Sequence, residues 1–189
     1  MLQPVDCVLR TKRLIVRLAR SADAKAIAAF YFADQAHQRE YSPVREVMFD
    51  PLFWRDWIEQ ARIEFDAGRT CQTFLFELDD HTVIGSANLS NIVRGLFHAC
   101  YLGYVIAGTH EGRGLMFEAL EALVGYAFDE LNLHRIMANY QPGNARSQAV
   151  LERLGFVNEG LARKYLFIGG IWRDHVLTSL TNEAWQATP

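Results

Sequence analysis

The segment best suited to chemistry is a glycine-rich junction between a predicted strand and a predicted helix. The strand ends at Tyr104-Val105-Ile106, and Glu111-Gly112-Arg113-Gly114-Leu115-Met116 leads straight into the helix. Two glycines one residue apart let the backbone approach a ligand closely, and the first N–H groups of a helix lie unpaired at the positive end of its dipole. The junction therefore predicts an anion site suited to a pyrophosphate, with Arg113 as a further phosphate ligand. The alternative is a tight turn with an exposed arginine.

Two other phosphate-binding motifs fit this junction poorly. The third glycine of a dinucleotide-binding fingerprint would fall at Phe117, and the strands before the junction form a meander rather than βαβ units. A P-loop requires Gly-Lys-Ser/Thr at the helix start, where this chain has Gly114-Leu115-Met116. The sequence therefore argues against both classes of nucleotide-binding protein.

A second polar segment leads from a strand into a helix about 30 residues further on. It reads Tyr140-Gln141-Pro142-Gly143-Asn144-Ala145-Arg146-Ser147, with Asn144 at the expected helix start. Asparagine is a good N-cap residue, and capping is compatible with contacting a ligand. Ser147 is either a structural residue of the first turn or a hydroxyl available to a bound group.

The spacing of apolar residues predicts the elements that must position these two segments. Alternation predicts strands, and apolar residues three or four apart predict amphipathic helices. Asp50-Pro51 is suited to open a helix that Gly68 ends, and Ser21 to cap another. Gly169-Gly170 is suited to the turn of a hairpin. Strands are expected over residues 9–18, 73–78, 83–92, 98–106, 134–140, 156–161, 165–168 and 171–180, helices over 24–31, 50–68, 114–131 and 144–154, and a polar loop over 34–46.

The order of these elements predicts an α/β fold with one mixed sheet. The helix over 114–131 joins the strand over 98–106 to the strand over 134–140, and such a crossover makes the two strands parallel neighbours. The strands before it form an antiparallel meander. Because a ligand crevice forms at the carboxyl ends of parallel neighbours, the chemistry is expected around residues 104–115.

Composition narrows the class of protein. The 189 residues, 50% of them apolar, predict a single domain over residues 1–189 with an ordinary hydrophobic core. A net charge of −3, from 19 Lys+Arg and 22 Asp+Glu, argues against strong nucleic-acid binding through a wide basic face. The three cysteines show no zinc or disulfide spacing, so no metal site is expected. The segment Met1–Asp6 is unlike a signal peptide and no long apolar run follows, which predicts a cytoplasmic protein without membrane contact.

The two polar segments together resemble the GNAT family of acetyl-CoA-dependent N-acetyltransferases. The features that carry the resemblance are the Gly112-x-Gly114 loop, the Asn144-x-x-Ser147 pattern and the helix end Leu154-Gly155-Phe156. The order of elements extends it over nearly the whole chain. Within the family, the ribosomal-protein alanine N-acetyltransferases of the RimJ type are the most similar, on the blocks 90–95, 97–104, 114–120, 134–140 and 172–178. One departure is Thr109, where the family loop often carries Gln or Arg.

The resemblance implies acetyl-CoA as cosubstrate and direct attack of an amine on its thioester. The implied cofactor-binding residues are Tyr104, Val105, Ile106, Glu111, Gly112, Arg113, Gly114, Leu115, Met116, Asn144 and Ser147. It also implies that Ser147 donates a proton near the leaving sulfur and that a backbone N–H at the end of the 98–106 strand stabilises the developing oxyanion. Cys100, in the middle of that strand without a histidine partner at known spacing, is disfavoured as an acyl-accepting nucleophile.

The general base stays open among Asp174, His175, His98 and Glu118. Each has a structural alternative: Glu118 complements the helix dipole, His98 is a strand residue, and Asp174 pairs with a neighbouring arginine. Tyr140 is a weaker candidate for an acid. A carboxylate or histidine acting through water would suffice, so residue types alone do not decide.

The resemblance implies the α-amine of a ribosomal protein, with alanine first, as the acceptor. An α-amine has a pKa near 7.7–8.0 and a lysine amine near 10.4, so the α-amine is easier to deprotonate. Two alternatives remain open: a small amine such as an antibiotic, polyamine or toxic peptide, and a non-catalytic acyl-CoA-binding ribosome-assembly factor. The chain could act as a monomer or as a homodimer.

Overall fold

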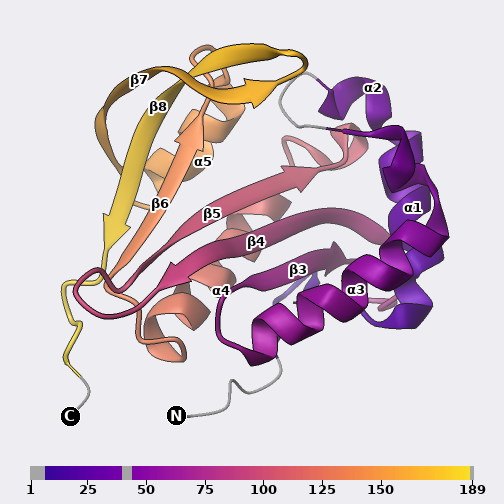
Figure 1. Ribbon diagram of the computed structural model, residues 1–189, viewed down its shortest axis with the longest axis horizontal. Coiled ribbons are helices and arrows are strands. Elements are labelled where there is room, and N and C mark those ends of the chain that lie inside the picture. Colours follow the sequence, from indigo (N-terminus) through magenta and orange to yellow (C-terminus); the bar gives the residue numbers. More distant parts are fainter. Residues whose placement is uncertain (1–6, 40–43, 188–189) are drawn as a thin grey trace.

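The computed structural model describes residues 7–39 and 44–187, and within them the strands form one eight-stranded sheet (Figure 1). The strand order is β1-β2-β3-β4-β5-β6-β8-β7. The strands are β1 (Val8–Arg10), β2 (Ile15–Leu18), β3 (Cys71–Phe76), β4 (Val83–Val93), β5 (Ala99–Ile106), β6 (Arg135–Tyr140), β7 (Val157–Ile168) and β8 (Ile171–Thr181). The α-helices are α1 (Ala24–Ala33), α2 (Gln35–Gln38), α3 (Pro51–Asp66), α4 (Leu115–Asp129) and α5 (Ala145–Arg153).

The pairing of β5 with β6 decides where a ligand can enter the sheet. Strands β1 to β5 pair antiparallel in chain order, and α4 then crosses over so that β6 lies parallel to β5. The parallel pairing runs from Ala99 opposite Arg135 to Leu102 opposite Ala138 and stops there. Beyond Leu102, β5 continues to Ile106 paired with β4 only, while β6 continues paired with β8. The predicted mixed sheet, meander and crossover are thus confirmed.

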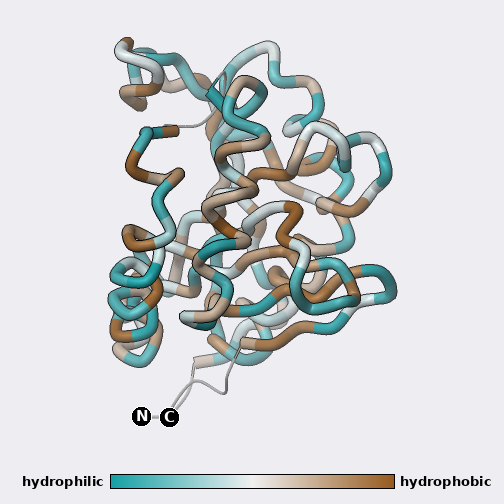
Figure 2. Tube along the Cα trace, turned by 90° about the vertical axis from the view of Figure 1, so that its right-hand side faces the viewer, coloured by the Kyte–Doolittle hydropathy of each residue, from teal (hydrophilic) through white to brown (hydrophobic). Residues whose placement is uncertain are grey.

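The sheet separates two hydrophobic clusters. Figure 1 shows α3 in front of the sheet and α1 at its right-hand side, with α4 and α5 behind the sheet. Alternate residues of β3 serve the two sides: Phe74 and Phe76 pack with α1 and α3, whereas Leu75 packs with α4. Figure 2 shows hydrophobic and hydrophilic residues alternating along the chain, which is the pattern of elements with one buried face.

The helix α3 begins and ends as its sequence predicts. The Asp50 side chain accepts a hydrogen bond from the Leu52 N–H at 2.8 Å, and Pro51 occupies the first helical position. Trp54 and Ile58 are buried against the front of the sheet. Gly68 lies just beyond the helix end with φ of 68°, a left-handed conformation that favours glycine.

Two predictions for the first 50 residues are wrong. The single strand expected over 9–18 is two antiparallel strands, because Thr11 and Leu14 close a turn through the bond from Thr11 N–H to Leu14 O at 2.9 Å. The polar loop expected over 34–46 contains α2 and a 3-10 turn, Glu46–Phe49, that starts at its end. Residues 40–43 of that loop lie outside the described part, as does the segment Met1–Asp6.

Two smaller predictions also need correction. Ser21 does not cap α1 with its side chain; it starts a 3-10 turn, Ser21–Asp23, in which Asp23 accepts from the Arg20 N–H at 2.6 Å. The strands expected over 156–161 and 165–168 are one strand, β7, with a register irregularity between Ala162 and Leu166. The glycine turn at residues 169–170 between β7 and β8 is confirmed.

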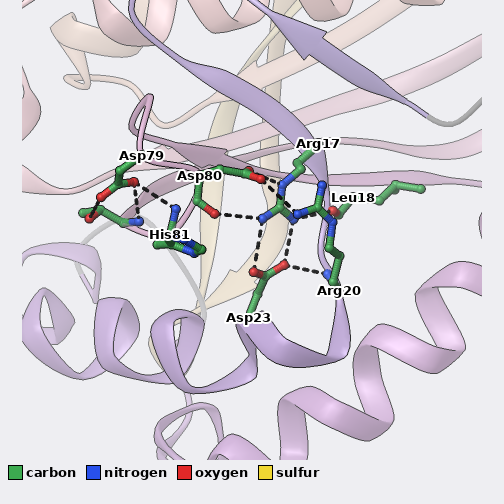
Figure 3. A network of polar contacts seen from close by, with 8 residues as sticks. Arg17, Leu18, Arg20, Asp23, Asp79, Asp80 and His81 are labelled. Carbon is green, nitrogen blue, oxygen red and sulfur yellow. Dashed lines mark hydrogen bonds and ion pairs between the residues drawn. The ribbon is translucent and has the colours of Figure 1, made fainter.

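A buried arginine ties the first helical segment to the sheet (Figure 3). Arg17 on β2 is 1% exposed and donates to Asp23 at 2.7 Å and to Asp80 at 2.6 Å. Its guanidinium also lies over the Phe76 ring, 3.8 Å from the centroid. Burial opposes ionisation, but the two carboxylates raise the pKa of Arg17 above its usual value. The ion pairs therefore compensate for the cost of burying the charge.

In the described residues no helix combines the length and apolar character that a membrane crossing requires.

Replacing one partner of this buried arginine should cost considerable stability. Asp23→Ala is expected to lower the free energy of unfolding by about 3–5 kcal/mol, because the Arg17 charge stays buried with a partner removed. Asp66→Ala is the control, since Asp66 forms an exposed pair with Arg62 one helical turn away, and such pairs contribute about 0.3–0.5 kcal/mol. Urea unfolding measures both variants. Equal losses would contradict the role of Asp23.

Candidate functional site

A cleft of about 380 Å³ lies where β5 and β6 diverge, a volume typical of small-molecule sites. Its walls come from the ends of β5 and β6, the starts of α4 and α5, α2 and one residue of β8. Ten of the eleven predicted cofactor-binding residues line it: Tyr104, Val105, Ile106, Glu111, Gly112, Gly114, Leu115, Met116, Asn144 and Ser147. The crevice predicted around residues 104–115 is therefore present.

The start of α4 has the geometry of an anion cradle. Gly112 and Gly114 have φ of 69° and 72°, so both use the left-handed conformation that favours glycine. A Cβ on Gly112 would meet no heavy atom within 4 Å, so the space in front of this backbone is open. The first N–H groups of α4 have no hydrogen-bond partners within the helix, and they point out of the helix end at which these two glycines lie. A pyrophosphate therefore fits here, and no side-chain atom has to move away from Gly112 first.

Arg113 is the predicted cofactor ligand that the structure places elsewhere. Its side chain is exposed and does not line the cleft. Its carbonyl oxygen accepts a hydrogen bond from Arg13 Nη1 at 2.9 Å, which holds the loop against the turn between β1 and β2. The backbone of residue 113 thus contributes to the shape of the cradle.

Glu118 supports the cradle and does not line the cleft. Its carboxylate accepts from Thr11 Oγ1 at 2.7 Å and from Arg13 Nε at 2.6 Å. Partial burial opposes ionisation, but these hydrogen bonds hold the pKa of Glu118 below its usual value. A carboxylate held by these hydrogen bonds is poorly suited to accept a proton. Glu118 instead connects the N-terminal strands to α4.

His98 and Asp174 also lie outside the cleft lining. His98 precedes β5 at the end opposite the cleft, and its ring packs on Trp185 with centroids 5.0 Å apart. Asp174 accepts from the Lys164 N–H at 2.7 Å, at the irregularity of β7 where Lys164 has φ of 50°. Both residues therefore have structural roles in the elements that carry them.

Ser147 and Tyr104 form a hydrogen-bonded pair inside the cleft. The Tyr104 hydroxyl lies 2.6 Å from Ser147 Oγ, and Asn144 Oδ1 accepts from the Ser147 N–H at 3.1 Å, so Asn144 caps α5. Burial raises the pKa of Tyr104 to about 12, so the phenol keeps its proton at neutral pH. The sequence had singled out Tyr104 for its backbone alone. Tyr104 lies two residues after Leu102 on β5, so the two side chains point to the same face of the sheet. This alternation is the signal that could have placed the Tyr104 side chain beside α5.

His175 is the base candidate that the structure brings into the cleft. It is 3% exposed and lines the wall contributed by β8. Its Nδ1 lies 3.1 Å from the Arg173 carbonyl oxygen. Because a carbonyl only accepts, Nδ1–H donates and the neutral ring keeps its lone pair on Nε2. The Tyr165 ring, 5.8 Å away, packs beside it.

Three polar side chains connect separate walls of the cleft. Glu111, between β5 and α4, accepts from Arg146 on α5, and its other oxygen lies 2.9 Å from His37 Nε2 on α2. All three line the cleft. His37 was missed by sequence reasoning because α2 has only four residues, too few for a periodic pattern.

Cys100 is fully buried in the core, and burial raises the pKa of its thiol to about 12. A thiol that resists ionisation is a poor nucleophile. This agrees with the expectation that Cys100 is not acylated.

The comparisons with known proteins agree with this geometry. A family model described as an acetyltransferase (GNAT) domain matches residues 13–157. The [ribosomal protein uS5]-alanine N-acetyltransferase of Escherichia coli (strain K12) is 46% identical over 178 residues, 94% of this chain and 92% of that protein. The ribosomal-protein-S5-alanine acetyltransferase from Vibrio fischeri superposes with a TM-score of 0.92 at 36% identity, covering 96% of this chain and all of that one. Mycobacterium smegmatis RimJ in complex with CoA-disulfide has a TM-score of 0.87 at 30% identity, covering 93% and 87%.

A side chain on the cradle should block acetyl-CoA, the ligand that the resemblance implies. Gly112→Val is expected to weaken acetyl-CoA binding at least about tenfold, because the added atoms occupy the open space in front of the backbone. Gly68→Val is a matched control: Gly68 has φ of 68°, equally open surroundings and a position outside the cleft. Both variants carry the same backbone strain. Isothermal titration of the folded variants measures affinity, and equal affinities would reduce the cradle to a simple turn.

Proposed function

The chain belongs to the GNAT family of acetyltransferases, and from that premise we propose that it acetylates the N-terminal α-amine of a ribosomal protein that begins with alanine. It is an acetyl-CoA-dependent enzyme. The observation that carries the choice of substrate is the 46% identity, over 94% of the chain, to a [ribosomal protein uS5]-alanine N-acetyltransferase. The cleft supports it, because the residues of the cradle and the Ser147–Tyr104 pair line one continuous space.

The cradle residues would hold the phosphates of acetyl-CoA. Backbone N–H groups between Gly112 and Met116 would donate to the pyrophosphate at the positive end of α4. The segment of β5 beyond Leu102 is unpaired on the side of β6, so it can hydrogen-bond the extended arm of the cofactor. Bound there, acetyl-CoA supplies the acetyl thioester that an amine attacks. A backbone N–H of the same β5 edge would stabilise the charge that develops on the carbonyl oxygen.

Ser147 and Tyr104 would return a proton to the departing sulfur. The Ser147 hydroxyl lies in the first turn of α5, and the protonated Tyr104 hydroxyl lies 2.6 Å from it. Because the raised pKa keeps the Tyr104 phenol protonated, the pair holds a proton at neutral pH that Ser147 can pass on.

His175 is the residue we favour as the base that removes the proton of the acceptor amine. Its bond to the Arg173 carbonyl leaves Nε2 unprotonated in the neutral ring, and the ring borders the cleft. An α-amine does not require a strong base, since about a tenth of it is already neutral at pH 7. His98, Glu118 and Asp174 lie outside the cleft lining and are not proposed for this role.

The proposed acceptor also implies a place of action. Ribosomal proteins are made and assembled in the cytoplasm, so we propose that the enzyme works there as one domain over residues 1–189. The three cysteines, each free and buried, are compatible with a reducing compartment.

Two side chains of the cleft should affect turnover without affecting cofactor binding. Ser147→Ala and His175→Gln are each expected to lower kcat by about 10- to 100-fold, the range of general acid–base catalysis, with the Kd of acetyl-CoA unchanged. His98→Gln, outside the cleft lining, should keep wild-type kcat. Steady-state kinetics and calorimetry measure the two quantities. Full activity of Ser147→Ala would leave Ser147 as a structural residue of α5.

The acceptor should be an α-amine of a protein chain. A peptide with a free N-terminal alanine is expected to be acetylated with a higher kcat/KM than spermidine or an N-blocked twin that contains lysine. Deprotonating the α-amine costs about 3.3–3.7 kcal/mol less than deprotonating lysine. Intact-mass spectrometry identifies the product, and preferential acetylation of spermidine or of the blocked peptide would assign the enzyme to small amines or to lysine.

A further inference from the structure

One polar side chain of the cleft has no role in the chemistry described so far. Gln38, the last residue of α2, is 2% exposed and lines the cleft. Its Oε1 is buried and has no hydrogen-bond partner among the described residues. Buried polar atoms are almost always paired, so an unpaired one at a ligand site points to a partner that arrives with the ligand.

The orientation of the Gln38 amide is fixed by Asp34. Gln38 Nε2 donates to Asp34 Oδ2 at 3.2 Å, while Asp34 Oδ1 accepts from the Gly108 N–H at 3.1 Å. A carboxylate only accepts, so the NH₂ end of the amide must face Asp34 and the oxygen must face away. The amide therefore offers the ligand an acceptor and cannot rotate to offer a donor without losing the Asp34 bond.

The groups around Gln38 Oε1 determine which part of a ligand can bind to it. An oxygen acceptor with a carboxylate behind it repels phosphate and carbonyl oxygens and attracts N–H donors, most strongly those of a cation. The phosphates of acetyl-CoA are anions and belong at the cradle on α4. An amino group is the part of the two substrates that brings a positively charged donor.

The position of α2 at the cleft is fixed by its contacts with the loop after β5. Figure 1 shows α2 beyond the end of β5. The contact between His37 and Glu111 fixes α2 to the loop that follows β5. Gln38, the residue after His37, is thus held in the cleft lining beside that loop.

We propose that Gln38 Oε1 accepts a hydrogen bond from the α-amino group of the acceptor and so orients its nitrogen for attack. This inference rests on the proposed function, because it requires an acceptor with an α-amine. It makes Gln38 a residue that recognises the amino group itself, with Asp34 as the residue that positions the amide.

The first half of the test changes only the ligand. Two alanine peptides are titrated into the wild-type enzyme saturated with CoA at pH 6.5, one N,N-dimethylated and one N,N,N-trimethylated. At this pH both are cationic: the dimethylated amine is mostly protonated below its pKa, and the trimethylated group carries a permanent charge but has no N–H to donate. The dimethylated peptide is expected to bind about tenfold more tightly. Equal affinities would overturn the proposal without any variant having to fold.

The second half changes the protein. Gln38→Leu should abolish the preference for the dimethylated peptide and raise the KM of the unmodified alanine peptide about tenfold, with the Kd of acetyl-CoA unchanged. Gln35→Leu, the same replacement on the same helix but outside the cleft lining, should keep both wild-type values. A preference that survives in Gln38→Leu would overturn the proposal. So would a loss of acetyl-CoA affinity with unchanged peptide binding.

Different results would exclude the proposed function and the role of Gln38. If the wild-type enzyme acetylates no peptide at its α-amine, the proposed function falls, and the role of Gln38 falls with it. If the wild-type enzyme acetylates the alanine peptide and Gln38→Leu does so with the same KM, only the role of Gln38 falls.

Discussion

Beyond Leu102, β5 runs on without β6 beside it, and every part of the site depends on this loss of pairing. Backbone N–H and C=O groups inside a sheet normally satisfy each other, so a strand that separates from its neighbour offers free groups along one edge. The crossover through α4 adds a helix N-terminus at the end of the same gap. One backbone feature thus creates both an extended hydrogen-bonding edge and an anion cradle.

The side chains around the gap hold its walls at fixed positions. Glu118 joins the N-terminal strands to the start of α4 through Thr11 and Arg13. Glu111 joins α2 to α5 through His37 and Arg146. These polar contacts are partly exposed, so each contributes little to stability by itself. Their consequence is geometric, because a transfer reaction requires that acid, base and cradle keep their spacing.

Sequence reasoning succeeded where local chemistry is decisive and failed where distant contacts decide. The Gly112–Gly114 loop, the Asn144 cap and the α4 crossover follow from residue types and spacing, and the structure has all three. Among the base candidates, residue type could not separate His175 from His98. Strand register places one at the cleft and the other at the far end of β5.

The same limit applies to short segments. A four-residue helix such as α2 has no periodicity to detect, so His37 and Gln38 gave no signal before the fold brought α2 to the cleft. The most direct test of the site is a crystal structure of the enzyme with CoA. It should place the pyrophosphate about 3 Å from the N–H groups of residues 112–116 and the sulfur within hydrogen-bond reach of Ser147 Oγ. A pyrophosphate bound away from this loop, or a sulfur remote from Ser147, would contradict it.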